Sequence, residues 1–204
     1  MKKFLLFCGI VLIAGSNLMG QTDFYFRHYQ VENGLSHNTV MCSLQDEKGF
    51  MWFGTKDGLN RFDGNAFKVF RQNETIAGSI GNDYIRCLFL DKNQRMFVGT
   101  QRGLYRYYPL TESFAHIASS GNKSIKEVSV DNNGHVWYIA EGVLTRQETT
   151  RFRNYDPALF FNPTALCSTA DGSIWVAAGD GTLKKYLPGS DSFERFSILS
   201  KTTA

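Results

Sequence analysis

The sequence has little excess charge of either sign and no motif for binding phosphate. Its 204 residues contain 22 Lys and Arg against 19 Asp and Glu, and the first two lysines belong to a leader segment. Proteins that follow nucleic-acid phosphates need a basic face, so the near-neutral balance argues against a nucleic-acid partner. A Gly-rich phosphate loop leading into a helix, a nucleophile elbow and an Asp-rich calcium loop are also missing. We therefore expect no cofactor, and no ATP-binding or phosphoacceptor chemistry in this chain.

Cysteine and histidine are scarce, with four of each. Outside the leader the cysteines are Cys42, Cys87 and Cys167, each four residues before the aspartate of a repeated unit described below. Equivalent positions in different units lie too far apart for the ~5.5–6 Å Cα separation that a disulfide prefers. We expect free, small, buried residues on the first strand of each unit. No histidine has a second ligand at a zinc-like spacing, so no metal site is expected.

Only one long apolar run is present, and it lies at the start of the chain. Residues 1–20 begin with Lys2-Lys3, continue through the apolar segment Phe4–Ala14 and end in small and polar residues before Gln21. This pattern is typical of a secretory signal peptide, because the apolar segment is short for a membrane helix; an uncleaved anchor is the alternative. We expect an exported, periplasmic chain that meets the membrane only through this segment or through domains outside the sequence.

One pattern recurs four times, which is the first thing to settle in any sequence. Each copy has an anchor aromatic residue with an aspartate before it, a glycine and a leucine after it, and two large apolar residues at its end. The anchors are Trp52, Phe97, Trp137 and Trp175. The aspartates are Asp46, Asp91, Asp131 and Asp171, the last of which lies four rather than six residues before its anchor. The closing pairs are Phe67/Phe70, Phe114/Ile117, Phe152/Tyr155 and Phe193/Phe196.

Each unit reads as four short strands, because the landmarks separate runs of about five residues rich in Val, Ile, Phe, Tyr and Trp. In the first unit these runs are Thr39–Leu44, Met51–Gly54, Leu59–Phe62 and Ala66–Phe70. Lys56-Asp57-Gly58 predicts a tight hairpin turn, and Asp171-Gly172 another in the fourth unit, since glycine tolerates positive φ.

A single four-stranded meander leaves apolar side chains on both faces, so the copies must stack. Repeats of ~40–45 residues that stack around an axis indicate a β-propeller. The sequence therefore predicts an all-β fold of four four-stranded antiparallel blades. The expected boundaries are a lead-in strand at 21–37, blades at about 38–71, 82–118, 124–156 and 163–196, and a tail at 197–204.

The first unit resembles a known repeat. The pattern Asp-x-x-Gly-x-x-Trp-x-Gly-Thr-x-x-Gly-Leu-x-Arg-Phe, from Asp46 to Phe62, looks like the two-component regulator propeller repeat. Residues 26–36 are similar to the lead-in found before the first such repeat. Units three and four depart from the pattern, with Ala140-Glu141 and Ala178-Gly179 at the place of the Gly-Thr pair.

The resemblance implies an N-terminal fragment of the periplasmic sensor region of a hybrid two-component receptor, a histidine kinase joined to a response regulator, of the Bacteroidetes. Such sensors resemble seven-bladed rings, so we expect a partial arc of a seven-bladed propeller; closure of four blades into a ring is the alternative. The resemblance also implies carbohydrate fragments as ligands and dimerisation as the signalling step, with phosphorelay chemistry in a kinase absent from this chain. The partners would be an oligosaccharide and either a second copy or the missing blades.

In a propeller, the turns between second and third strands open on one face, where polar groups can bind sugar hydroxyls. The candidate ligand-binding residues on these turns are Lys56, Asp57, Gln101, Arg102, Glu141 and Asp180. We expect a non-catalytic sensor module. One alternative is a periplasmic propeller enzyme, a lyase or glycosidase, which would need two carboxylates or a Tyr/His pair about 5–10 Å apart. The other is an inactive truncated gene remnant.

Overall fold

The computed structural model describes residues 25–156 and 160–197. The expected signal peptide at 1–20 and almost all of the expected tail lie outside these residues. The described residues form 16 strands in four sheets, each a four-stranded antiparallel meander in chain order. The all-β prediction and the division into four blades are therefore confirmed.

The strands follow the repeat. Blade 1 consists of β1 (Val40–Gln45), β2 (Met51–Thr55), β3 (Gly58–Phe62) and β4 (Phe67–Phe70). Blade 2 consists of β5 (Ile85–Leu90), β6 (Met96–Thr100), β7 (Gly103–Tyr108) and β8 (Ser113–His116). Blade 3 consists of β9 (Ile125–Val130), β10 (Val136–Ala140), β11 (Val143–Gln147) and β12 (Phe152–Tyr155). Blade 4 consists of β13 (Pro163–Ser168), β14 (Ile174–Ala178), β15 (Thr182–Leu187) and β16 (Ser192–Ser197).

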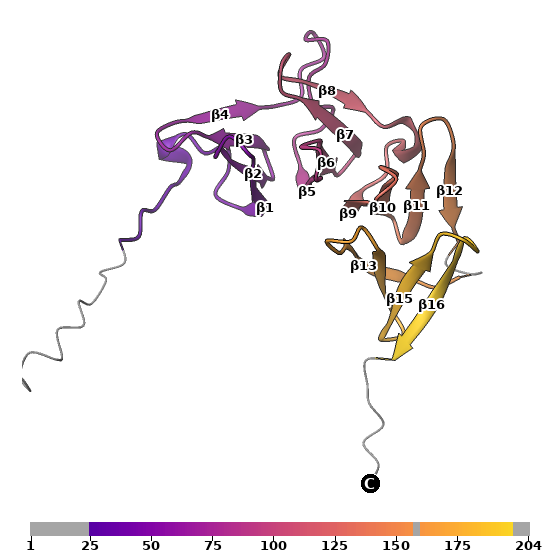
Figure 1. The fold of residues 1–204 in the computed structure, drawn as a ribbon. Coiled ribbons are helices and arrows are strands. Elements are labelled where there is room, and N and C mark those ends of the chain that lie inside the picture. The colour runs from indigo at the N-terminus through magenta and orange to yellow at the C-terminus, as the bar shows by residue number, and fades with distance from the viewer. Residues whose placement is uncertain (1–24, 157–159, 198–204) are drawn as a thin grey trace, which may run out of the picture.

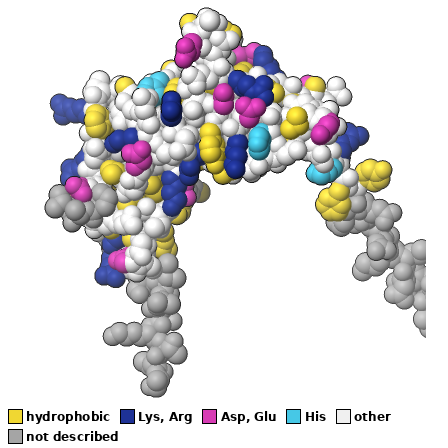
Figure 2. All heavy atoms as spheres, turned by 180° about the vertical axis from the view of Figure 1, so that it is seen from behind, with side chains coloured by type: hydrophobic (Ala, Val, Ile, Leu, Met, Phe, Trp, Pro, Cys, Tyr) yellow, Lys and Arg dark blue, Asp and Glu magenta, His cyan; other side chains and the backbone are white. Residues whose placement is uncertain are grey.

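The blades stand side by side in an open arc (Figure 1). The first strands β1, β5, β9 and β13 line its concave edge and contact one another from blade to blade, whereas the last strands lie on the outside. Blades 1 and 4 lie far apart at the two ends of the arc. Figure 2 shows the arch from behind, with Lys and Arg interspersed among Asp and Glu over that face. Four blades therefore do not close into a ring in this chain.

The hydrophobic cores lie between the blades rather than within them. Trp52 of blade 1 packs with Tyr107 and Phe114 of blade 2, and Trp137 of blade 3 packs with Tyr186 of blade 4. Two anchors also stack on the last aromatic residue of their own blade, with ring centroids 5.7 Å apart for Trp52 and Phe70 and 5.6 Å apart for Trp137 and Tyr155. Burying an aromatic ring of this size on both faces stabilises by roughly 1.5–3 kcal/mol per side chain, which a lone blade cannot gain.

Close approach of neighbouring blades depends on a glycine in the second strand. A Cβ atom on Gly54 would lie 2.5 Å from Cys42 Sγ and 2.6 Å from Ile85 Cγ2 of the next blade, and Gly99 has an equivalent environment. The strand register places Ile139-Ala140 and Ala177-Ala178 at the positions of Gly54-Thr55. The sequence alignment of units three and four was therefore wrong by one residue. Gly54 lies two residues after Trp52, and Ile139 and Ala177 lie two residues after Trp137 and Trp175.

The lead-in is not a strand over its described part. Residues 31–33 form a short 3-10 turn, η2 (Val31–Asn33), and the flanking residues are irregular. Tyr29 packs edge-on against Phe62, with ring centroids 4.9 Å apart. Ser36 N–H donates to Asn60 Oδ1 at 2.8 Å, so side-chain contacts, not ladder hydrogen bonds, fix this segment. The prediction of a lead-in strand at 21–37 is wrong for residues 25–37, because polar caps compete with strand pairing there.

The fourth unit also differs from its predicted alignment. Thr169, not Asp171, occupies the landmark position, since its N–H bonds Ser173 O and its carbonyl accepts from Gly172 N–H, as in the other blades. The turn spans Thr169–Ser173 and is not a two-residue hairpin at Asp171-Gly172. Cys167 is consequently not equivalent to Cys42 and Cys87.

The three cysteines are free and lie on first strands, as expected. Cys42 and Cys87 are partly buried beside the strand glycines, but Cys167 is exposed. The prediction that Cys167 is buried is wrong, because Ala165 takes the inner position across from Ala177.

Candidate ligand-binding site

The structure places the six predicted binding residues in the turns between second and third strands, one turn in each blade. Lys56-Asp57 joins β2 to β3, and Gln101-Arg102 joins β6 to β7, each between paired Thr and Gly residues. Glu141 and Asp180 lie in the corresponding turns of blades 3 and 4. We call this set the hairpin face. No hydrogen bond or ion pair within the described chain joins two of its members.

Several hairpin-face side chains already have partners in the protein. The Asp57 carboxylate lies 2.7 Å from Arg71 Nη2, and Gln101 Oε1 accepts from Arg86 at 3.0 Å. The Asp180 carboxylate accepts from the Thr182 N–H and hydroxyl, which lowers its pKa below the usual range. These contacts order the turns and keep their polar groups in fixed positions.

The landmark aspartates organise the other end of each blade. The Asp131 carboxylate accepts the N–H groups of Asn133 and His135 and the indole N–H of Trp137, the last at 2.9 Å. Asp46 binds its turn and Trp52 in the same way, at 2.8 Å from the indole nitrogen. Carboxylates that accept several N–H groups are held as turn acceptors, which explains the aspartate six residues before the anchor in blades 1, 2 and 3.

A salt-bridge cluster joins blades 1 and 2. Arg61 lies across the ladder from Trp52, with its guanidinium 5.7 Å from the ring centroid. Its Nη1 atom lies 3.0 Å from Oε1 of Glu112, which is on the turn between β7 and β8 of the next blade. Lys68 contacts the same carboxylate. One acidic residue thus ties the outer strands of blade 1 to blade 2.

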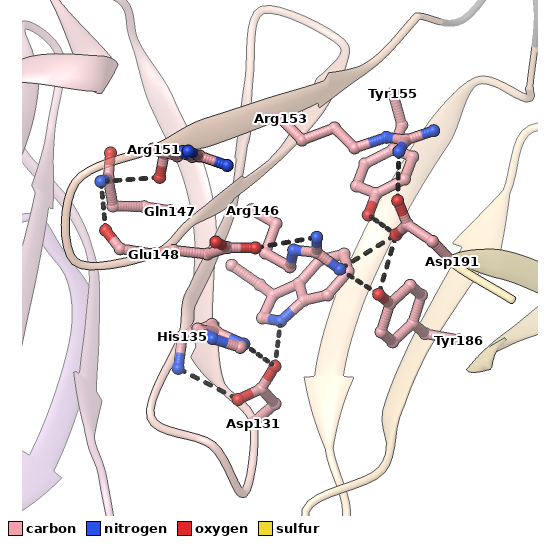
Figure 3. Close-up of polar contacts among 11 residues, drawn as sticks. Asp131, His135, Arg146, Gln147, Glu148, Arg151, Arg153, Tyr155, Tyr186 and Asp191 are labelled. Carbon is pink, nitrogen blue, oxygen red and sulfur yellow. Dashed lines mark hydrogen bonds and ion pairs between the residues drawn. The ribbon is translucent and has the colours of Figure 1, made fainter. Parts of the chain in front are cut away.

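An equivalent salt-bridge cluster, made by different residues, joins blades 3 and 4 (Figure 3). Asp191, on the turn between β15 and β16, accepts from Arg146 at 2.9 Å and contacts Arg153. The Tyr155 and Tyr186 hydroxyls each donate to Asp191 Oδ1 at 2.8 Å. Burial opposes ionisation, but these hydrogen bonds and the arginines hold the pKa of Asp191 below its usual value.

Among the described residues, blades 2 and 3 have no equivalent salt-bridge cluster. Arg106 pairs across the ladder with Phe97 as Arg61 does with Trp52, so an acidic partner is expected on the turn between β11 and β12. Four residues lie between Gln147 and its paired Phe152, whereas six lie between Tyr107 and Phe114 and between Tyr186 and Phe193, so the hairpin of blade 3 is two residues shorter than those of blades 2 and 4. Counting back from the first paired phenylalanine places Thr150 where blades 2 and 4 have Glu112 and Asp191.

The interface between blades 2 and 3 is correspondingly open, and a groove of about 820 Å³ lies there. Smaller side chains make the space: Phe97 replaces tryptophan, Ala115 replaces Lys68 or Arg153, and Gln147 replaces Tyr107 or Tyr186. Exposed aromatic rings, Tyr108 and Phe152, lie in its lining. The remaining lining includes Arg95, Arg106, His116, Ser119, Lys123, Asn133, His135, Glu148, Thr149 and Thr150.

The groove is also where a cation is left without a counter-ion. Arg95 is paired with Asp91 at 2.6 Å, and Glu148 is paired with Arg146 at 2.9 Å. The Arg106 side chain has a cation–π contact, 4.8 Å from the Tyr108 ring centroid, and no hydrogen bond or ion pair with any described residue. Sequence reasoning missed this site, although the shortened turn in unit three was a usable signal.

Residues 25–156 and 160–197 contain no group of three or more His, Cys, Asp and Glu that could hold a metal ion. No helix within those ranges is both long and apolar enough to cross a membrane.

Sheets that radiate from an arc, packed face to face through aromatic anchors, define a β-propeller-type repeat protein. Residues 34–57 match the family model described as Two component regulator propeller. The chain therefore contains a two component regulator propeller repeat, as its sequence predicted. The match covers η2's C-terminal flank, β1, β2 and the first turn of the hairpin face.

Individual relatives agree with this assignment. Over 59 residues, 29% of this chain, the sequence is 42% identical to Histidine kinase P4 of Formosa agariphila. The extracellular domain of the putative hybrid two component system BT3049 of B. thetaiotaomicron shares the fold, with a TM-score of 0.68 over 84% of this chain and 22% identity. A virginiamycin B lyase from Staphylococcus aureus also shares it, with a TM-score of 0.64 over 88% of this chain and 13% identity. The chain spans 4% of the kinase, 26% of the BT3049 chain and 62% of the lyase.

Proposed function

We propose that this chain is a ligand-sensing propeller module of a two-component signal transduction receptor, exported to the periplasm, where it binds glycan fragments without transforming them. The supporting observation is the repeat match over residues 34–57. It coincides with a described hairpin, β1–β2, whose aspartate, tryptophan and glycine each have a defined structural task. The kinase relative and the extracellular-domain neighbour support the same reading.

Binding is assigned to the hairpin face. Lys56, Arg102 and Glu141 are polar residues on turns that the strands hold in place, and neighbouring turns are linked through the inter-blade loops. Gly58 N–H donates to Asp83 O at 2.7 Å, and Gly103 N–H donates to Lys123 O at 2.8 Å. Rigid turns with unsatisfied polar side chains suit hydrogen bonding to sugar hydroxyls.

The absence of turnover is part of the proposal. The carboxylates of Asp46, Asp91 and Asp131 accept backbone N–H groups of their own turns and bond to Trp52, Arg95 and Trp137 respectively. A general acid or base has to face a substrate with a proton to exchange, and these three carboxylates face their own turns. The lyase neighbour shares the fold alone, since its identity is 13%.

Titration calorimetry of the purified chain against neutral and acidic oligosaccharides tests the proposal. We expect saturable binding with no products by chromatography, weakened in a Lys56→Ala/Arg102→Ala double variant and unchanged in Lys48→Ala. Lys48 is a matched control because it is exposed on the turn at the opposite end of blade 1. Product formation would show that the chain is an enzyme and not a sensor. If no saccharide binds, glycan sensing is rejected.

Association is the second part of the proposal, with a second copy or further blades as the partner. The two ends of the arc present blade faces to solvent, and blade 4 exposes Phe196 beside half-buried Trp175. Light scattering of the chain with and without ligand tests it, and we expect the mass to rise above that of one chain. A monomer at every concentration would contradict it.

A further inference from the structure

We propose that the groove between blades 2 and 3 binds the anionic group of an acidic saccharide, a carboxylate or sulfate ester, with Arg106 as the anchoring residue. This inference rests on the proposed function and gives it a ligand class and a second location, away from the hairpin face. The basis is the difference between the blade 2–3 interface and the blade 1–2 and 3–4 interfaces, which have the same strand arrangement but different side chains.

The comparison isolates one missing charge. At the blade 1–2 interface Arg61 is paired with Glu112, and at the blade 3–4 interface Arg146 is paired with Asp191. At the blade 2–3 interface the equivalent Arg106 is present, but Thr150 stands at the position of the acidic residue. An arginine that is regularly matched by a carboxylate, and here lacks one, presents its planar donor fork to an external carboxylate or sulfate.

The surrounding charges reinforce the site. Lys123 lies in the lining and makes no side-chain hydrogen bond or ion pair with a described residue. The negative group in the lining, Glu148, is directed to Arg146 at 2.9 Å, and the Asp91 carboxylate behind Arg95 is already paired. Arg106 and Lys123 therefore remain as positive charges facing the groove without a counter-ion.

The shape of the groove favours a sugar over a simple ion. Its volume of about 820 Å³ lies within the ~300–1,000 Å³ range of small-molecule sites. Tyr108 and Phe152 are 39% and 55% exposed and offer flat faces for a sugar ring. Hydroxyl groups of Thr149 and Thr150 complete a lining able to bond ring hydroxyls.

The structure also explains why the groove stays open. In blades 1 and 3 the residue across the ladder from the arginine is a cation, Lys68 or Arg153. In blade 2 the residue at this position is Ala115. The tyrosine that packs edge-on against the anchor at the closed interfaces, as Tyr107 does against Trp52 at 5.0 Å, is replaced by Gln147. Smaller side chains on both walls and a shorter turn leave room that the two closed interfaces lack.

The test is calorimetric titration of the full chain with trigalacturonate, with a sulfated neutral trisaccharide, and with an uncharged trisaccharide of the same length. We expect trigalacturonate or the sulfated sugar to bind at least about tenfold more tightly than the uncharged sugar, as one charge-assisted pair provides. The preference should weaken as salt is added. The difference between the two charged probes identifies which anion Arg106 accepts.

Two variants locate the effect, and a third serves as the control. Arg106→Gln should remove the preference for charged sugars, whereas Lys48→Gln, an equal loss of charge in blade 1, should keep it. Thr150→Glu supplies the missing acidic residue and should also abolish anion binding, with a melting temperature no lower than that of the parent chain because the interface gains its ion pair. This second variant separates loss of the site from loss of folding.

The outcomes distinguish this inference from the proposed function. Equal binding of charged and uncharged sugars, unchanged in Arg106→Gln, would overturn the groove as an anion site while leaving saccharide sensing intact. A charge preference that Thr150→Glu does not reduce would also overturn it. Binding of an acidic peptide in place of every saccharide, lost in Arg106→Gln, would reject the saccharide as the ligand and with it the glycan-sensing proposal.

Discussion

Asp191 of blade 4 lies 2.9 Å from the Arg146 guanidinium of blade 3 and joins the two blades through a single carboxylate. It also accepts from two tyrosine hydroxyls, so four side chains depend on one acidic residue (Figure 3). The hydrophobic layers between blades are their shared cores, and a polar contact of this kind adds to the stability of the blade 3–4 interface.

Asp191→Ala should therefore destabilise the chain by about 1–3 kcal/mol, the cost of leaving partly buried polar partners unsatisfied. The measurement is urea unfolding followed by tryptophan fluorescence, since Trp137 lies beneath the network. Glu194→Ala, an exposed carboxylate on the adjacent strand, is the control and should change stability by less than about 0.5 kcal/mol. Equal effects of the two variants would contradict a bridging role.

The same network predicts a pH dependence. The pKa of Asp191 is lowered from its usual 3.8, so its contribution is fully present above about pH 4 and is lost as the pH falls through the lowered value. Unfolding titrations between pH 7 and pH 2.5 should show Asp191→Asn losing less stability on acidification than the parent chain. Parallel curves for the two proteins would show that Asp191 does not titrate with unfolding.

The landmark aspartates give a matched pair of neighbouring variants. Asp46→Ala removes the acceptor for two turn N–H groups and the Trp52 indole, and should cost about 1–3 kcal/mol. Glu47→Ala, at the next, exposed position, should be close to neutral. Thermal melts of both variants check this. A neutral Asp46→Ala would mean that water replaces the carboxylate at no cost.

Gly54→Ala should destabilise the interface between blades 1 and 2 by about 1–3 kcal/mol through overpacking, because the new Cβ would meet Cys42 Sγ at 2.5 Å and Ile85 Cγ2 at 2.6 Å. Gly189→Ala is the control, since its Cβ would meet nothing within 4 Å. Chemical unfolding of both variants is the measurement. If the Gly54 variant is as stable as the control, the blades adjust more freely than the contacts indicate.

The three described cysteines should differ in reactivity. Burial raises the pKa of the Cys42 thiol to about 12 and raises that of Cys87 as well, so both are almost fully protonated at pH 8, and the thiolate is the reactive form. Cys167 is exposed. Alkylation at pH 8 followed by peptide mass spectrometry should label Cys167 first, and all three after unfolding in urea. Early labelling of Cys42 would show that blades 1 and 2 separate readily.

The sequence was informative about the unit and less so about alignment between units. Strand limits in blade 1 agree with the prediction within one residue at each end, because the hairpin residues Lys56 and Asp57 and the periodic aromatic residues specify them locally. Unit four was misaligned because Asp171 looks like a landmark aspartate, although Thr169 holds that position. Both residues are polar and lie in the same turn, so the sequence does not distinguish them. The backbone hydrogen bonds of the turn show that Thr169 holds the landmark position.

The hairpin-face residues remain a prediction, whereas the groove at Arg106 was not foreseen. The arginine itself is part of the repeat and therefore looked ordinary. Its missing partner, the residue replaced by Thr150, is contributed by the following blade more than 40 residues away in the sequence. Pairing between blades has no local signature, so the exception could be seen only after the three interfaces were compared.

By itself the sequence determined that this protein is a set of four meanders with aromatic anchors, because short-range patterning, turn glycines and the recurrence of landmarks are local properties of the chain. Only the tertiary structure decided that the blades form an open arc, that the lead-in segment is pinned by caps rather than paired as a strand, and which arginine lacks a carboxylate. The reason is physical: the curvature of the arc and the matching of charges depend on side chains that meet across blades, where distance in sequence carries no information about distance in space.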